Sequence, residues 1–569
     1  MTAKMVRCTI RVIRDGTPYH FGEFLPFANR VGKLGPNVKK EGTMNLTRRN
    51  FLEGSALAGI TAAVGLAGCS SGSQKEAPGE KQAESSPSTH NPVKTEDFDI
   101  VVVGSGTAGT CAALRASEKG ASVLCLEKNS GLMGTSAFAE GFAGVNSRFQ
   151  ADQGIQIDPI SVISDTMNYH HCACLAPVVR EMVYNSGETM NWFEENGVTF
   201  AAVAALGNSY PTWHLPADEK GMTTHVSTVL GILQPAAEAM GVEFRTEEPM
   251  TGLVVENGTV KGVYAQGKEG EIQINAKAVI LATGGWANNP EMFEKLTAKS
   301  YDSVRVWGLE GRDGDGINFA VNEAGAATHH PEAVMWHTGA LDGTDAFSDI
   351  PNFTLLMQPT LHVNENAQRY FNEAFTSDFT CCGNALSSQG SNYVIIDDAY
   401  IDHIETVGPW MPMPNLGAFA GQPFECRDGI ESAKGLVKAN TIEELAEKLG
   451  LDKEELAKTV DNYNKYCENG LDEEYGKSAD MLLPVSKAPF YGGKVTPTLF
   501  TTVGGLKVNS QMQVVNEAGE AIGGLYAAGG DANGMYGANY DVDVMSGGQQ
   551  GWCATSGRLA AEHAVETLK

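Results

Sequence analysis

The hydrophobic pattern between residues 99 and 127 predicts a strand, a helix and a second strand in that order. After Asp99, residues 100–103 form an unbroken apolar run of β-branched side chains, which is typical of a buried parallel strand. A glycine-rich turn follows, then a helix-like stretch at 110–119 and a second apolar run at 121–126 that ends at Glu127. This order predicts a βαβ unit and therefore an α/β fold.

The turn after the first strand has the spacing Gly-x-Gly-x-x-Gly. Gly104 permits a tight turn, Gly106 lets the backbone approach a pyrophosphate, and Gly109 allows close packing of helix on strand. Free N–H groups at the start of the helix attract phosphate, and Glu127 can accept hydrogen bonds from ribose hydroxyls. The predicted nucleotide site consists of Gly104, Gly106, Thr107, Ala108, Gly109, Glu127 and Lys128.

Two distant segments repeat the pattern of an apolar strand followed by glycine. One is residues 278–282, and the other is residues 524–528 near the C-terminus. The turns after these strands contain Thr283, Gly284, Gly529 and Asp531, which are further candidate cofactor residues.

These three segments together resemble the FAD site of the FAD-dependent oxidoreductase 2 superfamily, which includes fumarate reductase and 3-ketosteroid dehydrogenase flavoproteins. The resemblance covers residues 97–569 and implies FAD as the cofactor. It implies that Gly134, Thr135 and Ser136 wrap the pyrophosphate, and that Ser546 opens a helix facing the flavin. Covalent members use a histidine soon after the glycine-rich loop. Residues 129–147 contain none, so we expect non-covalent FAD.

The resemblance also implies the domain organisation. A Rossmann-like FAD-binding domain is expected at residues 97–331 and 501–569, with an inserted α+β capping domain at 332–500. Apolar residues at helical spacing in 441–469 predict a helix that packs in the core of the cap. A cap over an FAD domain makes a cleft that excludes water, which suits hydride transfer.

The family's substrate positions fall on residues that depart from its pattern. His337 matches the substrate histidine, but Ser377 stands where the family has an arginine acid. Thr501 or Phe500 replaces a second histidine. Tyr540 replaces the last arginine, as in the ketosteroid dehydrogenase branch, where a tyrosine binds the ketone oxygen. The catalytic candidates are therefore Tyr540, His337, Ser377 and Thr501.

In the fumarate reductases of this family, a further segment supplies charged side chains that bind the substrate's carboxylates. By resemblance this segment falls on residues 352–356, which carry no charge. A charge-assisted hydrogen bond contributes about 1.5–3 kcal/mol, and a dicarboxylate needs several. We therefore expect a neutral substrate that is larger than fumarate.

These departures predict an enzyme that reduces the C=C bond of a neutral α,β-unsaturated carbonyl compound by hydride transfer from flavin N5. A steroid-like or phenylpropenoid-like enone fits this description. Three alternatives stay open: a 3-ketosteroid-type dehydrogenase running the reverse reaction, a fumarate reductase-like enzyme, and a flavin electron-transfer lipoprotein without turnover. The missing arginine acid at Ser377 keeps the last alternative open.

The net charge and the cysteine spacing indicate which macromolecules, electron donors and metal ions the protein can bind. The net charge of −28 argues against a nucleic-acid partner, which needs a basic face. No Cys-x-x-Cys-His motif attaches a haem, so electrons must come from an external donor, either membrane quinol-linked or a cytochrome or flavin protein. We expect no metal, because no spacing matches a known ligand pattern. The alternative is a metal or iron–sulfur site formed by Cys172, Cys174, Cys381 and Cys382.

Residues 44–69 resemble a Tat lipoprotein signal. Arg48 and Arg49 precede a short apolar run, and the run closes on Leu-Ala-Gly-Cys at Cys69, which resembles a lipobox. We expect Tat export and a lipid anchor on Cys69 as the chain's attachment to the extracytoplasmic face of the cell-envelope membrane. Residues 1–43 are expected to be a non-native or mis-annotated extension. Residues 70–96, rich in Ser, Pro, Glu and Lys, are expected to form a flexible linker.

Export should depend on the arginine pair and anchoring on the cysteine. Replacing both Arg48 and Arg49 with lysine should leave the protein in the cytoplasm, because the twin-arginine pair is what the export machinery reads. Cys69→Ala should release a soluble species or leave the chain unprocessed, while Ser70→Ala should behave as wild type. Cell fractionation measures both effects. Unchanged membrane attachment of Cys69→Ala would rule out the lipid anchor.

Overall fold

The computed structural model describes residues 90–207, 209–345, 349–413 and 416–568. The expected extension at 1–43, the signal at 44–69 and the linker up to residue 89 lie outside this range. The end of the expected linker is strand rather than linker, because Lys94 already pairs with Ile272. Within the described ranges, no helix combines the length and the apolar character that crossing a bilayer requires.

The main sheet has eight strands among the described residues, and its centre is parallel. Strand β1 (Lys94–Val103) lies between β2 (Val123–Leu126) and β9 (Gly270–Leu281), and both neighbours run parallel to it. Buried β-branched side chains fill the end of β1, as the apolar run predicts. The remaining strands are β6 (Glu243–Arg245), β7 (Met250–Glu256), β8 (Thr259–Gly267), β18 (Gln513–Val515) and β19 (Ala521–Ala527).

The strand register brings the three predicted glycine turns to one edge of this sheet. Val103, the last residue of β1, pairs with Leu281, the last residue of β9. Leu281 in turn pairs with Ala527, the last residue of β19. Segments separated by hundreds of residues therefore end side by side, and their turns follow at the same edge.

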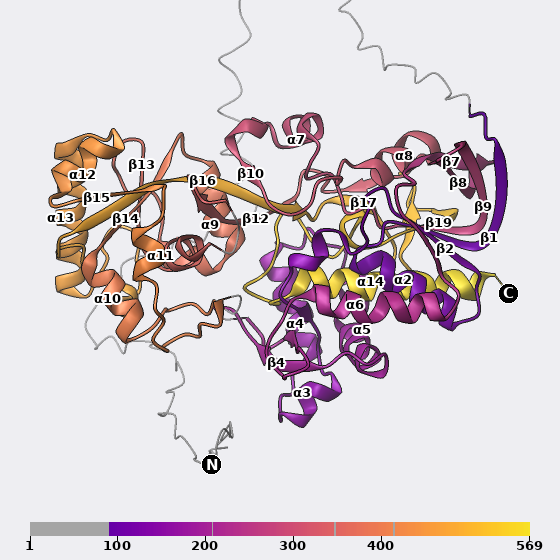
Figure 1. Ribbon diagram of the computed structural model, residues 1–569, viewed down its shortest axis with the longest axis horizontal. Helices are drawn as coiled ribbons and strands as arrows, with labels where there is room; N and C mark the ends of the chain where they lie inside the picture. Colours follow the sequence, from indigo (N-terminus) through magenta and orange to yellow (C-terminus); the bar gives the residue numbers. More distant parts are fainter. Residues whose placement is uncertain (1–89, 208, 346–348, 414–415, 569) are drawn as a thin grey trace, which may run out of the picture. The chain divides into compact units, whose positions relative to one another are not determined.

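Three helices lie together on one face of the sheet (Figure 1): α2 (Thr107–Glu118), α6 (Val226–Ala239) and α14 (Gly548–Thr567). The packing of α14 on α2 requires glycine at position 557, since a Cβ there would lie 2.2 Å from the carbonyl oxygen of Ala108. Helix α14 is buried along most of its length, which accounts for its lack of a polar stripe.

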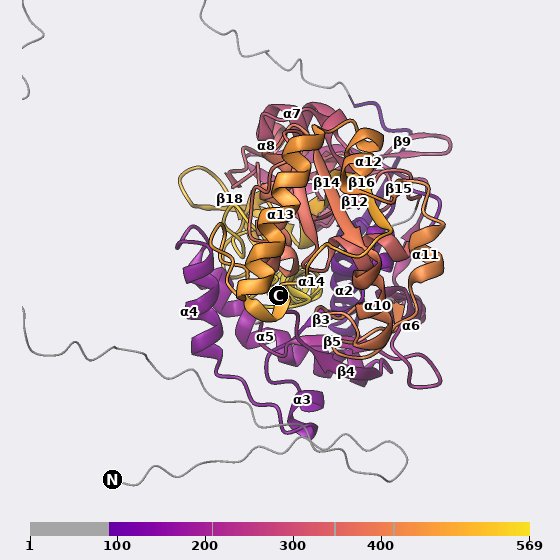
Figure 2. The ribbon, with the colours of Figure 1, turned by 90° about the vertical axis from the view of Figure 1, so that its left-hand side faces the viewer.

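A second sheet forms the core of the expected cap, and α12 (Ile442–Leu449) and α13 (Lys453–Asn469) lie beside its strands (Figure 2). The single helix predicted at 441–469 is two helices, because Gly450 adopts the left-handed conformation that ends α12. The strands are β10 (Arg305–Val306), β12 (Val334–Leu341), β13 (Leu361–Asn364), β14 (Asn392–Asp397), β15 (Leu436–Ala439) and β16 (Phe490–Thr502). Strand β16 continues across residue 500, and the expected domain boundaries stay predictions.

Shorter elements complete the described part. The helices are α3 (Arg148–Asp152), α4 (Pro159–Tyr169), α5 (Ala176–Glu195), α7 (Pro290–Thr297), α8 (Asp315–Ala324), α9 (Phe379–Ser387), α10 (Asp398–Thr406) and α11 (Arg427–Glu431), with short turns η1 (Gly134–Phe138) and η4 (Glu373–Ser377). Two small sheets contain β3 (Phe142–Ala143), β4 (Phe200–Ala204) and β5 (Trp213–Pro216), and β11 (Thr328–His329), β17 (Gly505–Lys507) and β20 (Ala532–Asn533).

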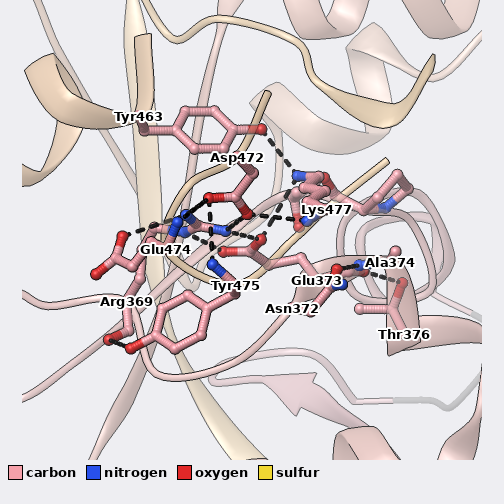
Figure 3. A network of polar contacts seen from close by, with 12 residues as sticks. Arg369, Asn372, Glu373, Ala374, Thr376, Tyr463, Asp472, Glu474, Tyr475 and Lys477 are labelled. Atoms are coloured by element: carbon pink, nitrogen blue, oxygen red, sulfur yellow. Dashed lines mark hydrogen bonds and ion pairs between the residues drawn. The ribbon is translucent and has the colours of Figure 1, made fainter. Parts of the chain in front are cut away.

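A buried ion network fixes the segment that leads into α9 (Figure 3). The Arg369 guanidinium donates to Glu373 at 2.9 and 2.7 Å and to Asp472 at 2.9 Å twice. The side chains of all three residues are at most 1% exposed. Lys477 donates to the Tyr463 hydroxyl at 2.8 Å. Because Glu373 begins η4, the network ties this turn to the loop after α13.

Removing one carboxylate from this network should destabilise the protein strongly. Asp472→Asn leaves Arg369 short of a buried partner, and breaking such a pair costs about 3–5 kcal/mol. Burial alone would raise the pKa of Asp472, but hydrogen bonds from Arg369 and backbone N–H groups hold it well below its usual range. The carboxylate therefore stabilises the fold above about pH 4, the unfolded value, and this stabilisation is lost as the pH falls.

Urea unfolding at pH 7 and at about pH 3 measures both effects. The difference in free energy of unfolding between wild type and Asp472→Asn should shrink at the lower pH. Glu447→Gln, which removes an exposed partner of Lys453, should unfold as wild type does. Equal effects of the two substitutions would contradict the role of the network.

Candidate functional site

A cleft opens where the glycine turns of the main sheet meet the second sheet. Its floor comes from the turns after β1 and β9, from η1 and from the start of α14. Its other wall comes from β12, α9 and β16. The described residues that line it include the predicted Gly104, Gly106, Thr107, Ala108, Glu127, Lys128, Gly134, Thr135, Ser136, Thr283, Gly284, His337, Thr501 and Tyr540.

Two glycine-rich segments face each other across the floor. Gly104 has φ +102°, and a Cβ there would lie 2.2 Å from the Ala282 carbonyl oxygen. A Cβ on Gly106 would instead point at η1, 3.4 Å from the Ser136 hydroxyl. The Thr107 amide donates to that same hydroxyl at 3.2 Å. Only small side chains at these positions leave room for a phosphate chain between the segments.

Glu127 and Lys128 both reach the cleft, in different electrostatic states. The Glu127 carboxylate accepts from the Ser105 amide at 3.1 Å, the Ser105 hydroxyl at 2.8 Å and the Asn129 amide at 2.9 Å. A carboxylate offers about four lone-pair sites, so it can still accept a ribose hydroxyl. Lys128 donates to Asp313 and Asp315 at 2.6 Å each, so its charge is already neutralised.

Four predicted cofactor residues lie behind the lining. The Asp531 carboxylate is fully buried and accepts from the Thr283 amide at 2.5 Å and the Gly285 amide at 2.9 Å, so it joins two glycine turns to each other. A Cβ on Gly109 would lie 1.8 Å from the Gly104 carbonyl oxygen, which makes Gly109 a packing residue. The four predicted residues that do not line the cleft are Gly109, Gly529, Asp531 and Ser546. Gly530 and Gly547, which follow Gly529 and Ser546 in the chain, do line it.

Ser377 is the one predicted catalytic residue that the structure does not bring to the cleft. It ends η4, and its hydroxyl lies 3.3 Å from the position that a Cβ on Gly207 would take. Asp543 faces the same position. The expectation that Ser377 occupies the place of the family's proton donor is therefore not supported by the geometry.

Tyr540 lies between the start of α14 and α9. Its hydroxyl accepts from the Gln549 amide at 3.4 Å, and the Thr380 hydroxyl donates to its carbonyl oxygen at 2.8 Å. Burial raises the pKa of Tyr540, and nearby Asp541 raises it further, against the opposing effect of the Gln549 and Gly548 amides. The phenol is therefore protonated at neutral pH and can donate a hydrogen bond into the cleft.

The wall beside Tyr540 is apolar and uncharged. His337 on β12 contacts the ring of Phe379 at 4.4 Å and that of Phe500 at 5.5 Å between centroids. Burial lowers the pKa of His337 to about 3, so its imidazole is neutral. Thr501 on β16 adds a hydroxyl. The apolar lining consists of Met335, Phe353, Met357, Phe379, Pro412 and Phe500.

Arg312 is a buried lining residue that sequence reasoning missed. Its guanidinium donates to the carbonyl oxygens of Trp307 at 2.8 Å, Leu309 at 3.1 Å and Phe500. Burial lowers its pKa to about 10, so it stays charged at neutral pH. It also donates to the Asn288 side-chain oxygen at 2.9 Å, so Arg312 joins the loop before α8 to β16.

Gln549 and Gln550 also line the cleft at the start of α14. The Gln550 side-chain oxygen accepts from the Thr107 hydroxyl at 2.7 Å, which connects α14 to the first glycine turn. The side-chain oxygen of Gln549 is buried without a hydrogen-bond partner among the described residues. Their position directly after Ser-Gly-Gly at a helix start was a signal that could have identified them. The aromatic wall gave no such signal, because it comes from three separate segments.

This arrangement fits FAD. Two glycine turns and a helix start can hold the pyrophosphate, Glu127 can hold the ribose, and the unpaired oxygen of Gln549 offers an acceptor beside Tyr540. No group of three or more His, Cys, Asp or Glu side chains is arranged for a metal ion within the described ranges. The alternative cluster of Cys172, Cys174, Cys381 and Cys382 therefore has no support from the geometry.

Blocking the space between the two glycine-rich segments should prevent FAD binding. Gly106→Val places two methyl groups toward Ser136, where the pyrophosphate must pass. The purified variant should therefore lack the visible flavin absorbance per mole of protein. Gly231→Val, at an exposed helical glycine with open space around its Cβ position, should retain it. Full FAD content in Gly106→Val would contradict the site.

Comparison with known proteins agrees with this site. A family model described as the FAD binding domain matches residues 99–541. The vinyl phenol reductase of Lactiplantibacillus plantarum is 35% identical over 492 residues, which cover 83% of this chain and 97% of that protein. The cytochrome-type fumarate reductase of Shewanella frigidimarina is 28% identical over 503 residues, covering 86% and 80%.

The fold also matches solved structures. The 3-ketosteroid delta1-dehydrogenase of Sterolibacterium denitrificans superposes with a TM-score of 0.70 at 20% identity, covering 83% of this chain and 100% of that one. That similarity shows the α/β flavoprotein fold. With the family model spanning most of the chain and the glycine turns meeting in one cleft, this chain belongs to the FAD-binding domain family of FAD-dependent oxidoreductases.

Proposed function

We propose that this enzyme uses FAD to reduce the C=C bond of a neutral, conjugated compound whose conjugation ends in an oxygen. The supporting observation is the composition of the wall beside Tyr540. It offers a phenol, a neutral imidazole and a hydroxyl among apolar side chains. The cations that the described residues bring to the cleft, Lys128 and Arg312, already donate to carboxylates and to backbone and amide oxygens. An α,β-unsaturated ketone or a vinyl phenol fits this chemistry.

The charge balance argues against a dicarboxylate substrate. Lys128 is paired with Asp313 and Asp315, and Arg312 is bound to backbone carbonyls. A buried carboxylate without a cationic partner costs several kcal/mol of desolvation. Fumarate would bring two such groups into the cleft.

Of the two substrate classes, the similarity to the vinyl phenol reductase supports a vinyl phenol over an α,β-unsaturated ketone. It is 35% identical over nearly its whole length, whereas the fumarate reductase relative is 28% identical. Its name describes reduction of a neutral conjugated phenol, which matches the uncharged wall. The phenylpropenoid-like substrate class is therefore favoured over the steroid-like class.

The chain's own residues have distinct tasks in this reaction. FAD, when bound and reduced, supplies the hydride. Tyr540 donates a hydrogen bond to the substrate oxygen on which charge develops, as an oxyanion-hole donor does. The amides at the start of α14 orient the phenol, since one of them donates to its hydroxyl oxygen. The apolar wall excludes water and so strengthens these interactions.

We also propose non-covalent FAD, an external electron donor and an envelope location. Residues 129–147, which include η1, contain no histidine that could form the covalent link. A donor outside the chain must reduce the flavin, because the sequence has no haem-attachment motif. The twin-arginine and lipobox-like segments support export and a lipid anchor.

Anaerobic re-oxidation of the reduced protein tests the substrate class. We expect vinyl phenols and neutral enones to restore the oxidised flavin spectrum rapidly. Fumarate should not act faster than buffer alone. Fastest re-oxidation by fumarate would contradict the proposal, and re-oxidation by no organic compound would favour electron transfer without turnover.

Tyr540→Phe tests the assigned donor in the same assay. Loss of one oxyanion-hole donor costs about 2.7–4 kcal/mol, so re-oxidation by substrate should slow a hundredfold or more. FAD content and reduction by an artificial donor should persist. Tyr526→Phe, which removes a buried hydroxyl bonded to His563, is the matched control and should react as wild type. A wild-type rate in Tyr540→Phe would make Tyr540 a packing residue.

A further inference from the structure

A second group of buried polar side chains lies behind Tyr540, outside the cleft lining. It consists of His170 at the end of α4, Tyr536 and Asp541. Asp541 is 0% and His170 is 3% exposed. The imidazole Nε2 and a carboxylate oxygen are 3.6 Å apart, within ion-pair distance. None of their side-chain polar atoms has a hydrogen-bond partner among the described residues.

Buried polar side chains without hydrogen bonds lower the stability of the folded protein, so their presence here indicates a function. A buried polar atom without a hydrogen-bond partner destabilises the fold, and these three side chains contribute five such atoms. Unpaired buried groups are rare in folded proteins and concentrate where chemistry needs them. The His170 ring packs edge-on against the rings of Tyr169 and Tyr536, which are contacts that an apolar aromatic ring could also make.

The group connects to Tyr540 through one small space. A Cβ placed on Gly548 would lie 3.5 Å from the Tyr536 hydroxyl, 3.5 Å from the Tyr540 ring and 3.6 Å from a carboxylate oxygen of Asp541. The hydroxyl of Tyr540 is bound at the same helix start. Three ionisable side chains therefore converge above a residue that has no side chain.

The far end of the group lies near the surface. His170 is followed directly by His171 and Cys172, which are both exposed. His171 and Cys172 also have positive φ angles of 50° and 59°, so the chain turns sharply after His170. Solvent therefore reaches the residues that directly follow His170 in the chain.

We propose that His170 and Asp541 form a proton relay that resupplies Tyr540 in each turnover. This proposal rests on the proposed function, because reduction of a C=C bond consumes one hydride and one proton. As hydride adds to the substrate carbon, the electron pair of the C=C bond moves toward the substrate oxygen, and Tyr540 transfers the proton of its hydrogen bond to that oxygen. Tyr540 then takes a proton from the Asp541 carboxyl group. Asp541 takes one from the His170 imidazolium, and His170 takes one from solvent. No electrons move along the relay.

The electrostatics agree with this order. Burial raises the pKa of Tyr540, and the negative charge of Asp541 raises it further. A phenolate beside a carboxylate is unfavourable, so Tyr540 can release its proton only if Asp541 holds one. The titratable groups that face Asp541 are Tyr169, His170, Cys174, Tyr536 and Tyr540. Among the residues that the structure describes, no lysine or arginine forms an ion pair with it.

Single-turnover kinetics of the FAD-loaded protein test the relay. His170→Gln and Asp541→Asn should each slow re-oxidation by substrate tenfold or more, with KM and FAD content within twofold of wild type. The solvent deuterium isotope effect on this step should rise, because proton supply becomes limiting. A loss of packing alone would leave that isotope effect unchanged. His362→Gln, which removes a buried, unpartnered histidine of the second sheet, should change neither quantity.

One further variant keeps the test decisive. Gly548→Ala fits without a clash and fills the shared space with a methyl group, so it should reproduce the slower step if the polar variants fail to fold.

Wild-type rates and isotope effects in His170→Gln, Asp541→Asn and Gly548→Ala would overturn the relay. If wild-type protein reduces no neutral compound, the proposed function itself fails, and this result is distinguishable from failure of the relay.

Discussion

The register of β1, β9 and β19 determines where chemistry can occur in this protein. Because Val103, Leu281 and Ala527 are paired neighbours, three glycine turns leave the sheet at one edge. Asp531 then joins the turns after β9 and β19 through buried hydrogen bonds. The glycines are required at this edge, since a Cβ on Gly104 or Gly109 would overlap backbone atoms. A cofactor cleft follows from these backbone contacts before any catalytic side chain is considered.

In the cleft, the charged side chains lie apart from the wall that we assign to the substrate. Its cations are neutralised by Asp313 and Asp315 or bound to backbone carbonyls, while the wall beside Tyr540 is aromatic and aliphatic. The buried network around Arg369 supports this wall from outside, because it fixes the turn that leads to Phe379 on α9. Ionic interactions thus hold the cap segment in place, and the reacting part of the cleft stays uncharged.

The sequence predicted most of the cofactor floor but only part of the substrate wall. Local spacing sufficed for Gly104, Gly106 and Glu127, because a strand, a glycine turn and an acidic strand end are contiguous in the chain. Tyr540, His337 and Thr501 came from family positions and do reach the cleft, whereas Ser377 does not. Contacts such as Arg312 with Phe500, or His170 with Asp541, join distant segments, so no local pattern could reveal them. The split of the predicted helix at Gly450 shows the same limit on a smaller scale.

A crystal structure of the FAD-loaded protein with a neutral saturated product such as 4-ethylphenol tests the central claim most directly. The account predicts FAD between the glycine turn at residues 104–109 and η1, with the ligand oxygen about 2.5–3.2 Å from the Tyr540 hydroxyl and its ring against Phe353 and Phe379. A ligand whose oxygen binds Arg312 or Lys128, with Tyr540 left without contact, would contradict it.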